Sequence, residues 1–170
     1  MSASAEAFAY TRANAFQRVI RQFAASGPGS WLFARVLHHL DRLVFRLTRG
    51  RATLGSLVSG LPVVMLTTTG ARTGQPRTVP VLGLPTPDGL AVIGSNWGRA
   101  GAPAWDRNLR ADPSASVAIG SHRRHVRAVE AEGERRERIW RDGLEIYPGW
   151  SQYERRAAGR RFRIYVLEEV

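Results

Sequence analysis

The sequence contains no cysteine and no lysine. The absence of cysteine excludes disulfide bonds, thiolate metal ligands and a cysteine nucleophile. Because lysine is absent, all 25 basic residues are arginine, and they outnumber the 14 acidic residues to give a net charge of +11. Arginine presents a rigid planar fork that suits phosphate and carboxylate groups. The charge therefore predicts an anionic partner, either nucleic acid, a membrane surface or a polyanionic small molecule, although a solvated basic surface explains it equally well.

Long hydrophobic runs are missing as well. The most apolar stretch, residues 52–66, is too short to cross a bilayer and is interrupted by two glycines and a proline. Charged residues interrupt the N-terminal region, so no signal peptide is expected. These absences predict a cytoplasmic protein, with peripheral contact at the inner face of the cell membrane as an open alternative.

The length of 170 residues favours one domain. Residues 1–60 are expected to form an N-terminal helical segment that packs on or beside a β-rich domain of residues 61–170. Apolar residues recur at helical spacing over 5–24 and 31–48, and Ser30 is a candidate N-cap for the second helix. This second helix is basic and amphipathic, so it either packs on the core of the domain or lies on an anionic membrane.

From Leu61 onward the periodicity changes to that of strands. Two short helices are expected, over 103–111 and 132–148. Six strands are expected, over residues 61–66, 78–85, 89–96, 116–120, 122–132 and 160–169. Their hairpin-like succession favours an antiparallel barrel or sandwich over a doubly wound parallel sheet. In the last strand, Phe162, Ile164 and Val166 should share one face.

The loop "TTTGARTGQPRTVP", residues 67–80, is the first candidate binding site. Gly70 and Gly74 allow the backbone to turn tightly and to approach a ligand closely. Threonine hydroxyls, exposed amides and the guanidinium groups of Arg72 and Arg77 would together suit a phosphate or a carboxylate. The spacing and the missing lysine exclude a P-loop, and the strand that follows excludes a dinucleotide fingerprint. An ordinary hairpin turn explains the same residues equally well.

Two further segments carry candidate binding groups. In "GSNWG", residues 94–98, small and polar residues would expose backbone groups and the Ser95 hydroxyl at a barrel rim, unless the segment is a plain turn. In "PAWDRNLRADP", Trp105, Asn108 and Leu109 share one helical face. There the indole would stack on a flat ring while the amide fixes polar edges, unless Trp105 is a core anchor.

The segment "YPGWSQY" places Tyr147, Trp150 and Tyr153 three residues apart around a Pro-Gly bend. These aromatic residues would either line a pocket for a planar hydrophobic substrate or belong to the core. The four histidines form two pairs without a carboxylate partner at metal-binding spacing, so no metal site is expected. Neither a nucleophile elbow for hydrolysis nor a nucleic-acid-binding motif occurs.

Taken in order, "LTTTGARTGQPRTVPV", "GSNWG", "PAWDRNLRADP" and "YPGWSQY" resemble the sequence pattern of the deazaflavin-dependent nitroreductase family. These are actinobacterial enzymes that use reduced coenzyme F420. The resemblance covers residues from about 61 to 170, and the loop motif is its most specific part. It implies a mainly β, α+β fold, namely a split antiparallel β-barrel of the FMN-binding type with two N-terminal helices and short peripheral helices.

The resemblance also implies roles for individual residues. Four residues of the loop, together with the neighbouring Thr69 hydroxyl, would hold the phosphate and the acidic tail of the coenzyme. The four residues are Arg72, Thr73, Gly74 and Arg77. The deazaflavin ring would lie against the backbone of Val79, Pro80 and Val81. The rest of the groove would comprise Ser95, Asn96, Trp97, Gly98, Ala104, Trp105 and Asn108. On the substrate side the catalytic candidates are Ser95, Tyr147, Trp150 and Tyr153.

Three places depart from the family pattern. Arg72 stands where many relatives have lysine, which keeps the charge, and Trp150 stands where a tyrosine is expected, which removes a phenolic donor. The pair Asn96 and Trp97 adds bulk where some relatives have lysine and glycine. Coenzyme binding is expected to survive these changes, whereas the choice of acceptor is expected to differ.

The expected function is the transfer of a hydride from reduced deazaflavin to a quinone or another planar electrophile. One alternative is an FMN-dependent oxidoreductase on the same barrel. Another is a non-catalytic basic module, either a coenzyme carrier or a protein that binds anionic lipid or nucleic acid. Nucleic acid is not expected as a partner of the enzyme, and a homodimer is left open.

Overall fold

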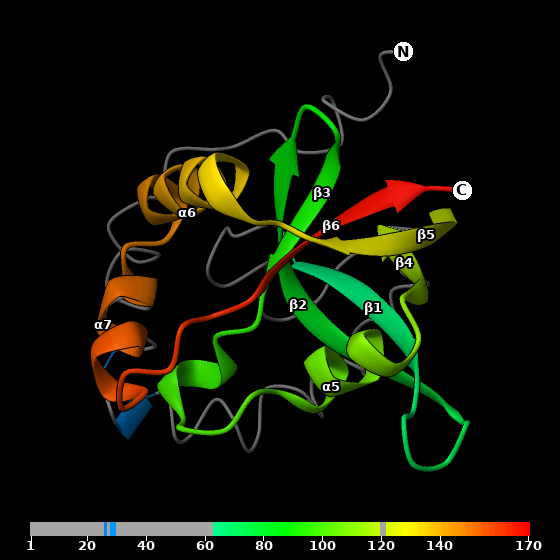
Figure 1. The fold of residues 1–170 in the computed structure, drawn as a ribbon, viewed down its shortest axis with the longest axis horizontal. Coiled ribbons are helices and arrows are strands. Elements are labelled where there is room, and N and C mark those ends of the chain that lie inside the picture. The colour runs from blue at the N-terminus through cyan, green and yellow to red at the C-terminus, as the bar shows by residue number, and fades with distance from the viewer. Residues whose placement is uncertain (1–25, 27, 30–62, 120–121) are drawn as a thin grey trace.

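The structure is a computed structural model that describes residues 26, 28–29, 63–119 and 122–170. Its six strands form a closed barrel in the order β1-β2-β3-β6-β5-β4, and every neighbouring pair is antiparallel (Figure 1). The strands are β1 (Val63–Thr69), β2 (Pro76–Thr86), β3 (Gly89–Ile93), β4 (Ser114–Ile119), β5 (His122–Glu130) and β6 (Ile164–Glu169). The antiparallel barrel and its six strands confirm the fold class expected from the periodicity.

Helices lie on one side and at one end of the barrel (Figure 1). They are the 3-10 turn η1 (Asn96–Gly98), α5 (Ala104–Ala111), α6 (Gly133–Ile146) and α7 (Gly149–Arg156). Helix α7 was not expected, because "YPGWSQY" was interpreted as a bend. Pro148 instead occupies the N-cap position of α7. Trp150 and Tyr153 therefore lie on the inner side of α7, whereas Tyr147 is the C-cap residue of α6.

Several boundaries differ from the sequence-based expectation. β2 begins at Pro76, two residues earlier than expected, because the pairing with β1 extends to the Thr69–Pro76 pair. β3 ends at Ile93 rather than at Asn96, because the chain turns into η1 there. The last strand, expected from residue 160, begins at Ile164.

The alternation along β6 divides the core into two clusters. Ile164 and Val166 join a cluster with Phe162, as the alternation predicted, and α6 and α7 cover this cluster on the outside of the barrel. Tyr165 and Leu167 point the other way into a second cluster that fills the barrel. This period-2 pattern gives β6 two buried faces, so its central residues are almost fully apolar.

The barrel cluster is closed at one end by α5. The barrel strands contribute Val64, Leu66, Leu90, Val92, Val117, Val126, Ala128, Tyr165 and Leu167 to this cluster. Trp105 and Leu109 of α5 pack against these side chains. The face predicted for α5 is therefore confirmed, and Trp105 is a core anchor that is 8% exposed.

The two helices expected over 5–24 and 31–48, and the proposed segment 1–60, lie almost entirely outside the described residues. At the short described stretch, Pro28 and Gly29 are helical and the Ser26 hydroxyl accepts a hydrogen bond from the Gly29 amide at 3.2 Å. This is an N-cap arrangement, so the chain becomes helical before Ser30, the cap that the sequence suggested. Within the ranges that the structure describes, no helix is long and apolar enough to cross a membrane.

Candidate functional site

The hairpin between β1 and β2 is a tight turn held by its own backbone. The Gly70 amide donates to the Gln75 carbonyl at 2.9 Å. The Gly74 and Thr73 amides donate back to the Gly70 carbonyl at 2.8 and 3.1 Å. Gly74 has a φ of 65°, a conformation that glycine adopts without steric cost. The amides of Thr73 and Gly74 are therefore already used, which corrects the expectation that exposed amides of this loop would bind an anion.

The side chains of Arg72 and Arg77 remain as anion-binding groups of the loop. Both are exposed, and neither has a hydrogen-bond or ion-pair partner within residues 63–119 and 122–170. Two guanidinium groups on one hairpin that lack a carboxylate partner among the described residues suit a phosphate or carboxylate ligand. The hairpin and the anion-binding interpretations of this loop are therefore compatible.

Other threonines near the loop have partners. The Thr69 hydroxyl bonds to the Asp112 carboxylate, which is also hydrogen-bonded by the Ser114 amide at 2.9 Å. The Thr67 and Thr78 hydroxyls lie 2.8 Å apart on the outside of the barrel. Thr69 therefore joins the loop to the start of β4.

On β2 the side chains alternate between the barrel interior and its outer surface. Val79 and Val81 pair with Leu66 and Val64 and pack against the barrel cluster. Pro80, between them, points to the outer surface, as Thr78 does. A flat ring beside this strand would therefore meet the Pro80 ring, the Thr78 side chain and the intervening backbone.

Asn108 connects α5 to the hairpin. Its side-chain oxygen accepts a hydrogen bond from the Ala71 amide at 3.0 Å, and its side-chain nitrogen donates to the Thr68 hydroxyl at 3.0 Å. The residue is 7% exposed, and Thr68 is 2% exposed. The oxygen and the nitrogen of the Asn108 side-chain amide thus both position the loop. Ala104, another predicted groove residue at the start of α5, is exposed.

The segment 94–99 has an unusual backbone. Three consecutive residues have positive φ: Asn96 at 47°, Trp97 at 59° and Gly98 at 75°. A Cβ on Gly98 would lie 2.9 Å from the Tyr153 backbone, so only glycine fits against α7 here. For Asn96 and Trp97 this conformation is strained. The Asn96 side chain donates to the Gly101 carbonyl at 2.7 Å, which closes the turn.

Arg160 holds this segment, and the sequence analysis did not identify it. Its guanidinium group donates to the carbonyls of Gly94, Ser95 and Arg99 at 2.8, 2.8 and 3.1 Å. No local pattern distinguishes this arginine from the other 24, because its three acceptors lie more than 60 residues away in the sequence.

The three aromatic residues predicted on the substrate side lie together in the outer cluster. Tyr147, Trp150 and Tyr153 are 3%, 2% and 2% exposed. The Tyr147 and Tyr153 hydroxyls lie 2.8 Å apart, and the half-buried Trp97 ring packs against Tyr153 with 6.1 Å between the ring centroids. The structure therefore brings the "GSNWG" and "YPGWSQY" segments together, although the tyrosines are packed rather than exposed.

A buried carboxylate that sequence reasoning missed anchors α5 to β6. Asp106 is 1% exposed; it accepts a hydrogen bond from the Tyr165 hydroxyl at 3.0 Å and faces Arg163 at 3.4 Å. Burial, followed by the charge of Asp106, raises the pKa of the Tyr165 phenol well above its usual value. Tyr165 is therefore a hydrogen-bond donor at physiological pH, and its role here is structural.

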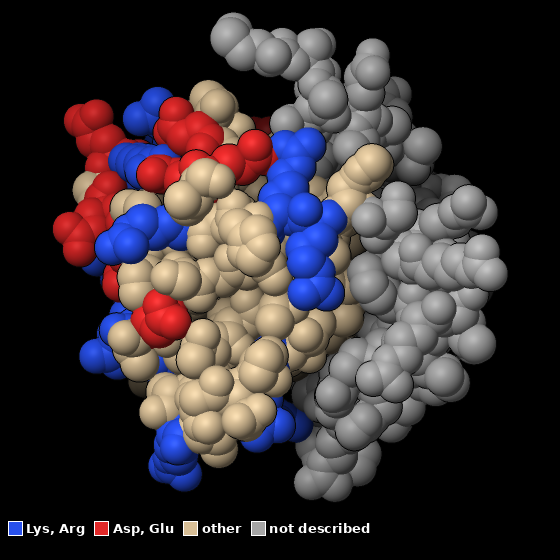
Figure 2. Space-filling view, turned by 90° about the vertical axis from the view of Figure 1, so that its right-hand side faces the viewer, with Lys and Arg blue, Asp and Glu red and all other residues tan. Residues whose placement is uncertain are grey.

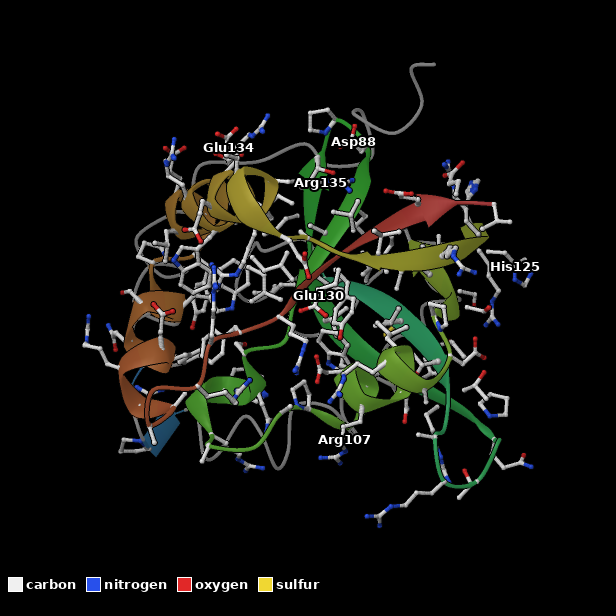
Figure 3. All side chains as sticks on the ribbon, in the orientation of Figure 1. Asp88, Arg107, His125, Glu130, Glu134 and Arg135 are labelled. Carbon is white, nitrogen blue, oxygen red and sulfur yellow. The ribbon has the colours of Figure 1, made fainter. Side chains whose placement is uncertain are left out.

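Acidic and basic side chains are unevenly distributed. Arg135 of α6 lies 3.1 Å from both Asp88, in the turn between β2 and β3, and Glu168 of β6, as Figure 3 shows for the labelled Asp88 pair. In the same view Arg107 of α5 points away from the barrel into solvent. Figure 2 shows carboxylates gathered among basic side chains over one region, while basic side chains at the lower edge of the view have no acidic neighbour.

Metal binding has no support within residues 63–119 and 122–170. No group of three or more histidine, aspartate or glutamate side chains there is arranged to hold a metal ion. His125 points outward from β5 (Figure 3), and His122 on the same strand is exposed.

The sequence matches the F420H(2)-dependent quinone reductase family over residues 41–169. The chain belongs to this family. It is therefore an oxidoreductase enzyme, and coenzyme F420 is its cofactor. Membership of this family favours an F420-dependent oxidoreductase over the two alternatives, an FMN-dependent oxidoreductase and a non-catalytic basic module.

Relatives of the family agree with this assignment. An F420H(2)-dependent quinone reductase of Mycobacterium tuberculosis is 35% identical over 102 residues, which cover 58% of this chain and 67% of the relative. A solved F420-H2 dependent reductase is 33% identical with a TM-score of 0.58, over 63% of this chain and 94% of that one. The fold is accordingly the split barrel, and the mycobacterial relatives fit an actinobacterial family.

Two other solved structures share the fold. A domain-swapped dimer is 29% identical with a TM-score of 0.61, over 84% of this chain and 100% of that chain. The heme storage protein HutZ of Vibrio cholerae has a TM-score of 0.51 at 14% identity, which shows a similar fold alone.

Proposed function

We propose that the protein transfers a hydride from reduced F420 to a quinone or a similar planar electrophile. The observation that carries the proposal is the pair of exposed guanidinium groups, Arg72 and Arg77, which lack a partner among the described residues and stand on the β1–β2 hairpin. An anionic coenzyme fits this donor set, because two arginine forks suit a phosphate and the carboxylates of an acidic tail. The family assignment supports the same reading.

The coenzyme ring would lie on the outer surface of β2. Thr78 and Pro80 present a flat, half-buried surface directly after Arg77. The 94–98 segment would form the other wall of the groove, with Ser95 and Trp97 toward the coenzyme and its acceptor. Asn108 holds the hairpin against α5 and so maintains the relative positions of the two arginines.

The bound coenzyme supplies the hydride donor, so the chain needs to position the reactants and exclude water rather than to provide an acid–base pair. A quinone that accepts a hydride also takes up one proton to become a hydroquinone, while the coenzyme is oxidised by two electrons. The Tyr147 and Tyr153 hydroxyls hydrogen-bond to each other at 2.8 Å, and both residues are buried. We therefore assign hydrogen bonding of the acceptor oxygen to Ser95, with a tyrosine hydroxyl of this pair as the alternative donor.

Two statements about partners belong to the proposal. A lipid-soluble quinone would be drawn from a membrane, and a peripheral contact through residues 1–60 would serve this purpose. The similarity to a domain-swapped dimer supports a homodimer as the assembly.

The first prediction tests the coenzyme site by titration of the purified protein with reduced F420, followed by menadione as acceptor. Arg72→Ala and Arg77→Ala should each weaken coenzyme binding about tenfold, since loss of a charge-assisted hydrogen bond costs roughly 1.5–3 kcal/mol. Arg138→Ala, an exposed arginine on α6, is the matched control and should bind as the wild type does. Unchanged affinity in both loop variants would refute the assignment, and absence of coenzyme oxidation by menadione would refute the quinone reductase activity.

A further inference from the structure

Arg160 lies in the connection between α7 and β6, directly after Ala158 and Gly159, whose φ values are 53° and 77°. From there its guanidinium group reaches the segment 94–99 and stacks over the Phe162 ring at 4.6 Å. One nitrogen donates to the Gly94 carbonyl, and the other donates to the carbonyls of Ser95 and Arg99. A single side chain thus fastens both ends of the segment.

The segment needs such support because of its backbone. Asn96 and Trp97 both adopt the left-handed region. Asparagine does so more readily than most residues, whereas a bulky residue such as Trp97 does so only when the surroundings enforce it. The internal hydrogen bonds are short-range, from the Gly98 amide to the Ser95 carbonyl and from the Arg99 amide to the Asn96 carbonyl. The bonds from Arg160 connect this strained turn to the rest of the fold.

Arg160 differs from the neighbouring arginines in what it contacts. Arg161 pairs with Glu137, and Arg163 pairs with Asp106 and Glu130. Within the described ranges Arg160 pairs with no carboxylate, and its Nε is buried without a hydrogen-bond partner. Its planar fork is therefore committed to three carbonyls, a geometry that the single ammonium group of lysine cannot reproduce.

We propose that Arg160 is a positioning residue for the coenzyme groove. It holds the segment 94–99 in the strained conformation that places Ser95 and Trp97 at the groove. The inference rests on the proposed function, because that function makes the segment a wall of the coenzyme site. Arg160 touches the segment rather than the reacting atoms, so its loss acts on coenzyme binding through Ser95 and Trp97.

The experiment compares Arg160→Lys with Arg161→Lys, the adjacent exposed arginine, in hydrogen–deuterium exchange and in titration with reduced F420. In Arg160→Lys the amides of Gly98 and Arg99 should exchange faster, and the coenzyme should bind at least tenfold more weakly. In Arg160→Lys, kcat for menadione reduction at saturating reduced F420 should change less than the KM for reduced F420. Arg161→Lys should match the wild type in each measurement.

A rescue experiment separates positioning from general stability. Free guanidinium ion supplies the missing planar donor, so adding it to Arg160→Ala should recover part of the lost affinity, whereas an equal concentration of sodium chloride should not. Wild-type exchange and affinity in Arg160→Lys would overturn the inference, and so would a loss of affinity in Arg160→Ala that guanidinium does not relieve. If Arg160→Lys does not fold, the guanidinium comparison in Arg160→Ala decides by the same criterion. If the wild type binds no F420, the proposed function fails, while the exchange comparison still tests the Arg160 contacts.

Discussion

At the scale of single residues, Asp112 shows how a local hydrogen bond couples charge to stability. The carboxylate follows α5 and accepts a hydrogen bond from the Ser114 amide at 2.9 Å. Hydrogen bonds from Ser114 and from the Thr69 hydroxyl, with a smaller contribution from the charge of Arg127, lower the pKa of Asp112 below its usual value. A lowered folded-state pKa contributes stability above the unfolded-state value, and this contribution is lost as the pH falls through the folded-state pKa.

The corresponding prediction concerns Asp112→Ala. Its melting temperature should fall below that of the wild type at neutral pH. The gap should narrow as the pH falls from about 4, where the unfolded-state carboxylate titrates, through the lower pKa of the folded state. Thermal unfolding followed by circular dichroism over a pH series measures the gap. Asp142→Ala, which removes an exposed carboxylate on α6, is the control and should melt close to the wild type at neutral pH. A gap for Asp112→Ala that is independent of pH would contradict the assignment.

At the scale of elements, the contact between α5 and the β1–β2 hairpin positions the candidate anion site. Trp105 and Leu109 bury the apolar face of α5 in the barrel cluster, and Asn108 on the same face reaches Thr68 and the Ala71 amide. Helix α5 therefore covers one end of the barrel core and also holds the loop that carries Arg72 and Arg77. A buried amide with two partners is costly to remove, because each partner is left unsatisfied.

Asn108→Ala should consequently lower the free energy of unfolding by roughly 2 kcal/mol, since two buried polar groups lose their partners. It should also weaken binding of reduced F420, because the hairpin loses its connection to α5. Urea unfolding and coenzyme titration measure the two effects. Arg110→Ala, on the exposed side of α5, serves as the reference and should leave both nearly unchanged. Equal stability of the two variants would show that the Asn108 contacts do not hold the loop.

At the scale of the whole molecule, the net charge of +11 is not spread evenly. Within the described part of the chain, the ion pairs involve α6, β5, β6 and Asp88, apart from the buried pair of Arg163 with Asp106 on α5. Arg72 and Arg77 have no such partner among the described residues, so part of the uncompensated charge lies on the hairpin that packs against α5. Such a surface attracts polyanions over distances that salt shortens, from about 10 Å at 0.1 M to about 3 Å at 1 M.

The affinity for reduced F420 should therefore fall steadily as the salt concentration rises. A plot of log Kd against log salt should be clearly flatter for the double variant Arg72→Ala with Arg77→Ala, because fewer charges attract the coenzyme. Arg161→Ala, which loses an arginine already paired with Glu137, should retain the slope of the wild type. Identical slopes for the double variant and the wild type would mean that the hairpin charges do not contact the coenzyme.

Much of this protein was determined by its sequence alone. Period-2 alternation predicted six strands and the shared face of Phe162, Ile164 and Val166, because alternation depends only on residues that are neighbours in the chain. Prolines and glycines predicted the position of the β1–β2 hairpin, because turn formation also depends on residues that are neighbours in the chain. Four ordered motifs identified the family, and family membership carries the coenzyme. The boundaries of β2 and β3 were less accurate, since strand ends are set by pairing partners and by the turn at Asn96.

Only the tertiary structure decided how the site is held together. Closure of the barrel brings Asn108 to Thr68 and Arg160 to Gly94. Trp150 and Tyr153 lie on α7, a helix that was not predicted, and they pack with Tyr147 in the outer cluster. It also decided that the Thr73 and Gly74 amides serve the turn, which leaves the anion to the side chains of Arg72 and Arg77. The physical reason is distance along the chain: composition and local spacing report what each residue can do, whereas folding selects which distant acceptor it reaches.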